Sequence, residues 1–205
     1  LGRRHNAQQA VEAIRAAQAK GFGNISLDLI FGIPGMSLRE WENNVLRAVI
    51  LGVQHISAYC LTISDNTVFG DMAEAGTLIP ASDEICEEQF MICHRILTDS
   101  GFCHYEISNY ARPGMRSRHN LHTWQDKPYI GLGVGAYSYL HGVRFGQSRD
   151  LSAFLDGRDI TVDRYIPDRR EQMEEYIMLG LRLAEGISEA DFRTRFGVDF
   201  WATRG

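Results

Sequence analysis

The chain has 205 residues, of which 44% are hydrophobic and 23% charged, and its formal net charge is −5. This composition is ordinary for a globular protein with a sizeable core. The acidic balance disfavours non-specific binding to nucleic acid, and no apolar run approaches the roughly 18 residues of a membrane span. The chain begins with Leu1 and has no signal-peptide pattern, so we interpret it as an internal piece of a longer, cytoplasmic protein.

The first 110 residues alternate between helical and extended patterns. Amphipathic spacing predicts three helices, at residues 6–20, 37–51 and 82–100. Short apolar runs predict three strands, at residues 25–31, 55–63 and 101–107. A turn-rich loop is expected at 64–81. Helices that alternate with short apolar strands indicate parallel βα units, so we predict an α/β fold.

The pattern changes near residue 110. Gly, Arg, His and aromatic residues become frequent, with a turn-and-strand segment expected at 129–139 and a strand or hairpin near 143–147. Helical spacing returns over residues 168–185 and 188–196. We therefore predict three parts: βα units, a Gly/Arg/His-rich strand-and-loop extension, and the start of a C-terminal helical domain. Their predicted bounds are 1–110, 111–165 and 166–205.

Asp28 is the sharpest single candidate for a functional residue. It lies within the predicted strand 25–31, where alternation places it on the face opposite to Leu27 and Leu29. That face would line the lumen of a barrel-like sheet, where a carboxylate is unfavourable unless it is paired or hydrogen-bonded. The Gly32–Gly35 turn follows at the carboxyl end of the strand, where such folds bind ligands. We expect Asp28 to contact a ligand, and a structural salt bridge is the alternative.

The densest group of polar side chains lies at residues 112–124. Its arginines, which can recognise carboxylates through paired hydrogen bonds, are Arg112, Arg116 and Arg118. Its possible axial ligands for haem iron are His119, His122 and Met115. A solvated basic loop is an equal alternative. A nucleic-acid contact is a third, and it fits the acidic net charge poorly.

Two further patterns are interpreted as structural. The run Gly131, Gly133 and Gly135 imitates a dinucleotide fingerprint, but it lacks the sixth-position glycine, the opening helix and the acidic residue, so we reject NAD binding. Cysteines stand at positions 60, 86, 93 and 103, too far apart in sequence for local metal chelation. Cys86 and Cys93 share the apolar stripe of one helix and are interpreted as core residues.

Taken together, several motifs resemble the radical S-adenosylmethionine proteins of the oxygen-independent coproporphyrinogen III oxidase-like family, particularly its haem-chaperone branch. The matching stretches occur in family order and are residues 1–5, 28–35, 55–59, 105–110, 119–120 with Trp124, and 131–138. The resemblance implies a partial (β/α) barrel of radical-SAM type, containing its later strands only, with a small C-terminal helical domain.

The resemblance also implies cofactors and their residues. Arg3 and Asp28 fall on positions that line the family's S-adenosylmethionine site, and Ile30 with the Gly32–Pro34 turn would supply apolar and backbone contacts. A zwitterionic ligand with a sulfonium cation suits a neighbouring carboxylate and guanidinium. The parent protein would hold a 4Fe–4S cluster on a CxxxCxxC segment upstream of residue 1, so no cluster ligand is assigned in this chain.

Two functions follow from the family, and the sequence favours one of them. The chaperone branch carries a His-Asn-x-x-Tyr-Trp motif, which corresponds here to His119, Asn120 and Trp124, with Thr123 in place of the tyrosine. This favours a haem-binding chaperone that delivers haem to acceptor proteins. The tentative haem or porphyrin contacts are His119, His122, Trp124, Arg112, Arg116 and Arg118. The alternative is decarboxylation of coproporphyrinogen III to protoporphyrinogen IX by a deoxyadenosyl radical. An unrelated (β/α) sugar or phosphate enzyme is a third interpretation.

The predicted absence of the cluster segment and early strands has two consequences. Without cluster ligands, this chain should have no turnover by itself. Without its early strands, the barrel should expose a strand edge, through which we expect self-association.

Overall fold

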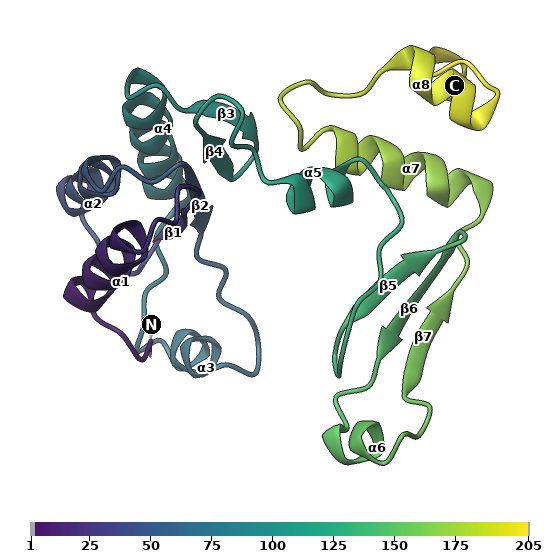
Figure 1. Cartoon of the computed structure of the whole chain (residues 1–205), viewed down its shortest axis with the longest axis horizontal. Helices are drawn as coiled ribbons and strands as arrows, with labels where there is room; N and C mark the ends of the chain where they lie inside the picture. The colour runs from purple at the N-terminus through teal and green to yellow at the C-terminus, as the bar shows by residue number, and fades with distance from the viewer. Residues whose placement is uncertain (1–2, 205) are drawn as a thin grey trace. The chain divides into compact units, whose positions relative to one another are not determined.

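The computed structural model describes residues 3–204 and contains two compact units, the first ending at Arg116 and the second beginning at Ser117 (Figure 1). The first unit is a mixed α/β structure, as the sequence predicts. The second combines an antiparallel sheet with helices. Within the described residues, every helix is too short or too polar to cross a membrane.

Four strands form the sheet of the first unit, in the order β1-β2-β4-β3. Strand β1 (Ser26–Phe31) pairs in parallel with β2 (His55–Cys60), and β4 (Asn109–Ala111) pairs antiparallel with both β2 and β3 (Cys103–Glu106). Strands β1, β2 and β3 therefore run in the same direction. The sheet is not purely parallel, because the chain turns back after β3 and inserts β4 between β2 and β3. Sequence reasoning missed β4, which has only three residues.

Helices pack against one face of this sheet. They are α1 (Ala7–Ala19), α2 (Leu38–Ile50) and α4 (Asp83–Asp99), close to the predicted bounds. Capping boxes at Asn6 and Ser37 satisfy backbone N–H groups at the starts of α1 and α2. The segment predicted as a loop at 64–81 contains a further helix, α3 (Val68–Glu74), which buries none of its residues and so carries no apolar stripe for a pattern to detect.

The core of the first unit lies between the helices and one face of the sheet. Ile14 of α1, Trp41 of α2 and Leu97 of α4 meet Phe31 and Ile56 there. Leu27 and Leu29 also pack against this core, whereas Ser26 and Asp28 are exposed. The alternation predicted for β1 is thus confirmed, because the pleat of a strand sends successive side chains to opposite faces.

The second unit contains three antiparallel strands and several helices. The strands, in the order β5-β6-β7, are β5 (Tyr137–Leu140), β6 (Val143–Gln147) and β7 (Thr161–Tyr165). The helices are α5 (Arg118–Trp124), α6 (Leu151–Leu155), α7 (Arg169–Gly180), α8 (Glu189–Phe196) and the 3₁₀ helix η1 (Trp201–Arg204). Phe192, Phe196 and Phe200 form a small aromatic core with residues of α7.

Helices α5 and α6 and strand β7 were not predicted from the sequence. The basic segment expected as a loop contains α5, whose N-cap Ser117 accepts a hydrogen bond from the Asn120 N–H. This helix has seven residues and buries none of them, so it has no detectable periodicity. Strand β7 is exposed along its whole length and therefore lacks the alternation of a half-buried strand.

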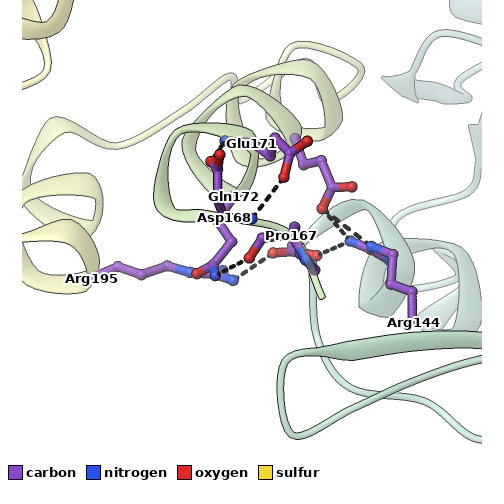
Figure 2. A network of polar contacts seen from close by, with 8 residues as sticks. Arg144, Pro167, Asp168, Glu171, Gln172 and Arg195 are labelled. Carbon is purple, nitrogen blue, oxygen red and sulfur yellow. Dashed lines mark hydrogen bonds and ion pairs between the residues drawn. The ribbon is translucent and has the colours of Figure 1, made fainter. Parts of the chain in front are cut away.

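A charged network joins parts of the second unit (Figure 2). The side chain of Asp126, which is 4% exposed, accepts hydrogen bonds from Arg144 of β6 and Arg195 of α8. Arg144 also donates to Glu175 of α7, at 2.7 Å. Burial disfavours the charged form of Arg144, but the hydrogen bonds and charges of Glu175 and Asp126 outweigh it and raise the pKa of its guanidinium. One buried carboxylate thus links the sheet to the C-terminal helices.

Candidate functional site

A cavity of about 410 Å³ lies along strand β1 of the first unit. Arg3, Asp28 and Ile30, three of the five residues predicted to contact S-adenosylmethionine, line this cavity together with residues of α1 and α2. Strand β1 is an edge strand of the described sheet, paired only with β2 there. The cavity therefore occupies space that a further strand could enter by pairing with β1.

The other two predicted contacts, Gly32 and Pro34, lie in the turn that leaves β1. Gly32 has a φ of +70°, in the left-handed region that favours glycine. A Cβ on Gly32 would lie 2.7 Å from the Sγ of Cys60 and 3.1 Å from the Sγ of Cys86. Glycine is thus required both by the backbone conformation and by the close approach of two sulfur atoms.

Gln89 of α4 fixes this turn, and sequence reasoning missed it. Its Oε1 accepts a hydrogen bond from the Gly32 N–H at 2.7 Å, and its Nε2 donates to the Met36 carbonyl at 3.2 Å. The side chain of Trp41 donates to the backbone carbonyl of Gln89 at 2.7 Å. Gln89 is completely buried. The one sequence signal for this role is a glutamine on the apolar stripe of an amphipathic helix. A buried amide there needs hydrogen-bond partners from another part of the fold.

Polar residues form a row across the face of the sheet that points away from the helices. The strand register places Asp28 beside Ser57, Ser57 beside Asn109, and Asn109 beside Glu106. Asn109 donates a hydrogen bond to Glu106, which is 1% exposed. The row brings two carboxylates to one face, and only Asp28 could be identified from the sequence.

His55 and Tyr105 extend this polar face. The Nδ1 of His55 lies 2.8 Å from the Ser26 hydroxyl, and its Nε2 lies 2.8 Å from the Tyr105 hydroxyl. A register shift between His104 and Glu106 lets Tyr105 reach His55. Burial lowers the pKa of His55, and the negative charges of Asp28 and Glu106 oppose this effect. Both ring nitrogens of His55 thus have a hydroxyl partner.

The six predicted haem or porphyrin contacts are divided between the units. Arg112 and Arg116 belong to the first unit, and Arg118, His119, His122 and Trp124 belong to the second. Arg112 is held by structural contacts: its guanidinium carbon lies 4.0 Å from the centre of the Phe102 ring, and it donates to the Ser100 carbonyl. Arg116 lies over the ring of Tyr105, at 5.7 Å.

The four residues of the second unit have different surroundings. Arg118 and His119 are exposed on α5. The Nε2 of His122 lies 2.7 Å from the Pro128 carbonyl and must donate its proton there, because a carbonyl only accepts. Trp124 lies under the Arg182 guanidinium, at 4.1 Å, and lines a cavity of about 730 Å³ whose lining includes none of the other five predicted residues.

The described residues do not fit an iron–sulfur cluster. Within residues 3–204, no three His, Cys, Asp or Glu side chains are grouped so that they could hold a metal ion. All four cysteines are free thiols. Cys93 is buried in the core, and Cys86 packs against that core, as the helical stripe predicts.

Comparison with known proteins finds relatives along most of this chain and a family match at its C-terminal end. Residues 168–205 match the family model of the HemN C-terminal domain. Relatives named heme chaperone HemW, from Synechocystis and Bacillus subtilis, are 37% and 34% identical over 92% and 96% of this chain. The chain covers 47% and 53% of these two relatives, so it spans about half of their length.

The fold of the chain also matches a solved structure. The chain matches coproporphyrinogen III oxidase (HemN) from Escherichia coli, described as a radical SAM enzyme, with a TM-score of 0.76 over 96% of this chain and 49% of that one, at 14% identity. Residues 168–205 of the chain are thus similar to the HemN C-terminal domain, and the predicted partial radical-SAM fold is confirmed. The sequence of the chain is similar to the relatives named heme chaperone HemW.

Proposed function

We propose that this chain is part of a haem-binding chaperone that delivers haem to acceptor proteins. The observation that carries the proposal is the identity of 30–37% to several relatives named heme chaperone HemW, over nearly the whole of this chain. The oxidase likeness supports the fold alone, because its sequence identity is 14%. Decarboxylation of coproporphyrinogen III is accordingly the less favoured candidate.

The proposed haem contacts are centred on helix α5. His119 is exposed, which leaves its imidazole accessible to an iron atom. His122 is the weaker candidate ligand, because its Nε2 already donates to the Pro128 carbonyl. Arg118, on the same helix, is a candidate for pairing with a haem propionate. Arg112 and Arg116 remain candidates from the first unit, although the ring contacts of both arginines compete with that role.

We also propose that the cavity along β1 binds S-adenosylmethionine in the full-length protein. Asp28 and Arg3 line the same space, and these groups suit the ammonium, sulfonium and carboxylate charges of that ligand. The apolar side chain of Ile30 suits a nucleoside. When bound, S-adenosylmethionine and a cluster supplied from outside these residues would provide radical chemistry. This chain's own residues would bind and orient the ligand.

A transfer experiment tests the chaperone proposal. Haem-loaded protein is mixed with a haem-free acceptor haemoprotein, and the Soret bands of the two proteins are followed over time. A carrier should transfer its haem to the acceptor faster than a matched solution of haem on serum albumin. If the haem stays bound, or if no haem binds, the carrier proposal is wrong and porphyrinogen oxidation becomes the preferred function.

Calorimetric titration of the full-length protein tests the S-adenosylmethionine site separately. Replacement of Asp28 by Asn should weaken binding about tenfold or more, because it removes a charge that faces a cationic ligand. Replacement of the exposed Asp71 on α3 by Asn is the matched control and should leave binding unchanged. Equal affinities for all three proteins would remove Asp28 from the site.

A further inference from the structure

Two cysteines that lie far apart in sequence meet beneath the Gly32 turn. Cys60 is the last residue of β2, and Cys86 lies in the first turns of α4. Their Sγ atoms are 3.5 Å apart. Both sulfurs also lie against Gly32, where an added Cβ would clash with the Cys60 sulfur at 2.7 Å and crowd the Cys86 sulfur at 3.1 Å. No sequence pattern indicates this pair, because the contact depends on how the helix packs against the strand.

The pair differs from the other two cysteines in access and in surroundings. Cys60 is exposed and Cys86 is partly buried, so a reagent in solution can reach the first thiol while the second lies behind it. Cys93 is buried in the core, and Cys103 is exposed on β3, the opposite edge strand of the sheet from β1. An accessible thiol with a second thiol in contact is the arrangement of an attacking and a resolving cysteine.

We propose that Cys60 and Cys86 form an oxidation site, in which a small-molecule disulfide of the glutathione class converts the two thiols into an intramolecular disulfide. The two Sγ atoms must approach by about 1.5 Å to reach the bonding distance of about 2.05 Å. Cys60 is the last residue of its strand, and residues 64–68 beyond it are exposed, so the chain on this side can absorb such a shift. The inference rests on the thiol geometry and is independent of the proposed haem function.

The reaction proceeds in two exchange steps. The Cys60 thiol first loses its proton to solvent, and the thiolate attacks one sulfur of the small disulfide, which releases one small thiolate. The Cys86 thiolate, formed in the same way, then attacks the Cys60 sulfur and releases the second small thiolate. The protein loses two protons and two electrons. The small disulfide gains the two electrons, and its two thiolates take up the protons.

The surroundings of Cys60 determine when this reaction is fast. Burial, the hydrogen bond with Cys86 and the nearby charge of Asp83 raise the pKa of Cys60 to about 11. Little thiolate is therefore present at pH 7. At pH values below that pKa, the rate of the first step should rise about tenfold for each unit by which the pH is raised. The site should respond to sustained oxidation rather than to brief exposure.

The disulfide would join parts of the first unit that frame the turn. It would tie the end of β2 to the start of α4 directly beneath Gly32, and it would close a loop over residues 61–85. The position of the Gly32–Pro34 turn, which belongs to the proposed S-adenosylmethionine site, would then depend on the oxidation state of this pair.

Oxidised glutathione and mass spectrometry test the inference. At pH 8 the Cys103→Ser variant, which lacks the other exposed thiol, should lose two hydrogen atoms in intact mass, and a non-reducing peptide map of the unsubstituted chain should show Cys60 joined to Cys86. The Cys86→Ser variant should stop at a glutathione adduct on Cys60, whereas the matched control Cys103→Ser should still form the internal disulfide. A lasting adduct on Cys60 in the unsubstituted chain, no reaction at Cys60, or cross-links mainly between chains would overturn the proposal.

Discussion

Replacement of Gln89 by Leu tests how the candidate site is held in place. The variant keeps nearly the same side-chain volume but removes both hydrogen bonds, so the Gly32 N–H and the Met36 carbonyl lose their side-chain partner. Each unsatisfied buried group costs about 1–3 kcal/mol. Because the Met36 contact is only partly buried, we expect a total loss of about 2–4 kcal/mol in the free energy of unfolding.

Urea unfolding and amide hydrogen exchange measure the two parts of this effect. A local loss of about 2 kcal/mol should speed exchange at the Gly32 amide by about 30-fold. The Gln89→Glu variant retains an acceptor for the Gly32 N–H. The control variant, Glu87→Gln, lies on the exposed side of the same helix and should change the free energy of unfolding by less than about 0.5 kcal/mol. If Gln89→Leu behaved like Glu87→Gln in both measurements, Gln89 would not hold the turn.

Three further predictions concern single residues. Gly32→Ala should lower the free energy of unfolding in urea more than Gly35→Ala does. Both positions have positive φ, which costs an alanine about 1–2 kcal/mol, but only at Gly32 would the added Cβ have neighbours within 4 Å. Equal losses for the two variants would contradict the packing argument. The lowered pKa of His55 means that the unfolded chain binds a proton there more readily, so stability should fall as the pH drops below about 6.5, by at most about 1.4 kcal/mol per unit. His55→Gln should flatten this pH dependence in unfolding titrations, and an unchanged slope would assign it elsewhere. Asp126→Ala should cost about 2–4 kcal/mol, because it leaves two partly buried guanidinium groups without their shared carboxylate. Asp156→Ala, which breaks the exposed ion pair with Arg158, should lower the free energy of unfolding by less than about 1 kcal/mol. Similar shifts in melting temperature for the two variants would show that Asp126 does not stabilise the second unit through its two arginines.

The elements of the first unit could be predicted from sequence because their signals are local. Capping residues such as Ser37 mark where helices begin, and the alternation around Asp28 identifies the two faces of β1. Apart from β4, which is buried but has only three residues, and the five-residue helix α6, the missed elements discussed above bury none of their residues. Helices α3 and α5 and strand β7 have no buried residues, so neither a helical nor an alternating pattern records them.

The candidate site was only partly predictable because its geometry depends on tertiary packing. Asp28 could be found, since a carboxylate within an apolar strand is conspicuous. Glu106 joins the same row only through the insertion of β4, and Gln89 reaches Gly32 only because α4 packs over the end of β1. The contact between Cys60 and Cys86 has the same origin. Such pairings bring together residues from separate elements, and no short-range pattern specifies them.

Self-association through a strand edge remains a prediction. Strand β1 is at one edge of the described sheet, with its second side open to a cavity rather than to another described strand. Unpaired N–H and C=O groups along such an edge can accept a strand from another chain. Sedimentation-velocity measurements over a range of concentrations should show dimers or larger species, and a monomer at all concentrations would contradict the prediction.

Haem titration followed at the Soret band is the most direct test of the proposed function. We expect the chain to bind haem, the His119→Ala variant to lose most of this binding, and the matched His122→Ala variant to retain it, because the Nε2 of His122 already donates to the Pro128 carbonyl. Absence of binding by the unsubstituted chain would contradict the assignment of haem to these residues. Binding that both variants retain equally would remove helix α5 as the source of the iron ligand.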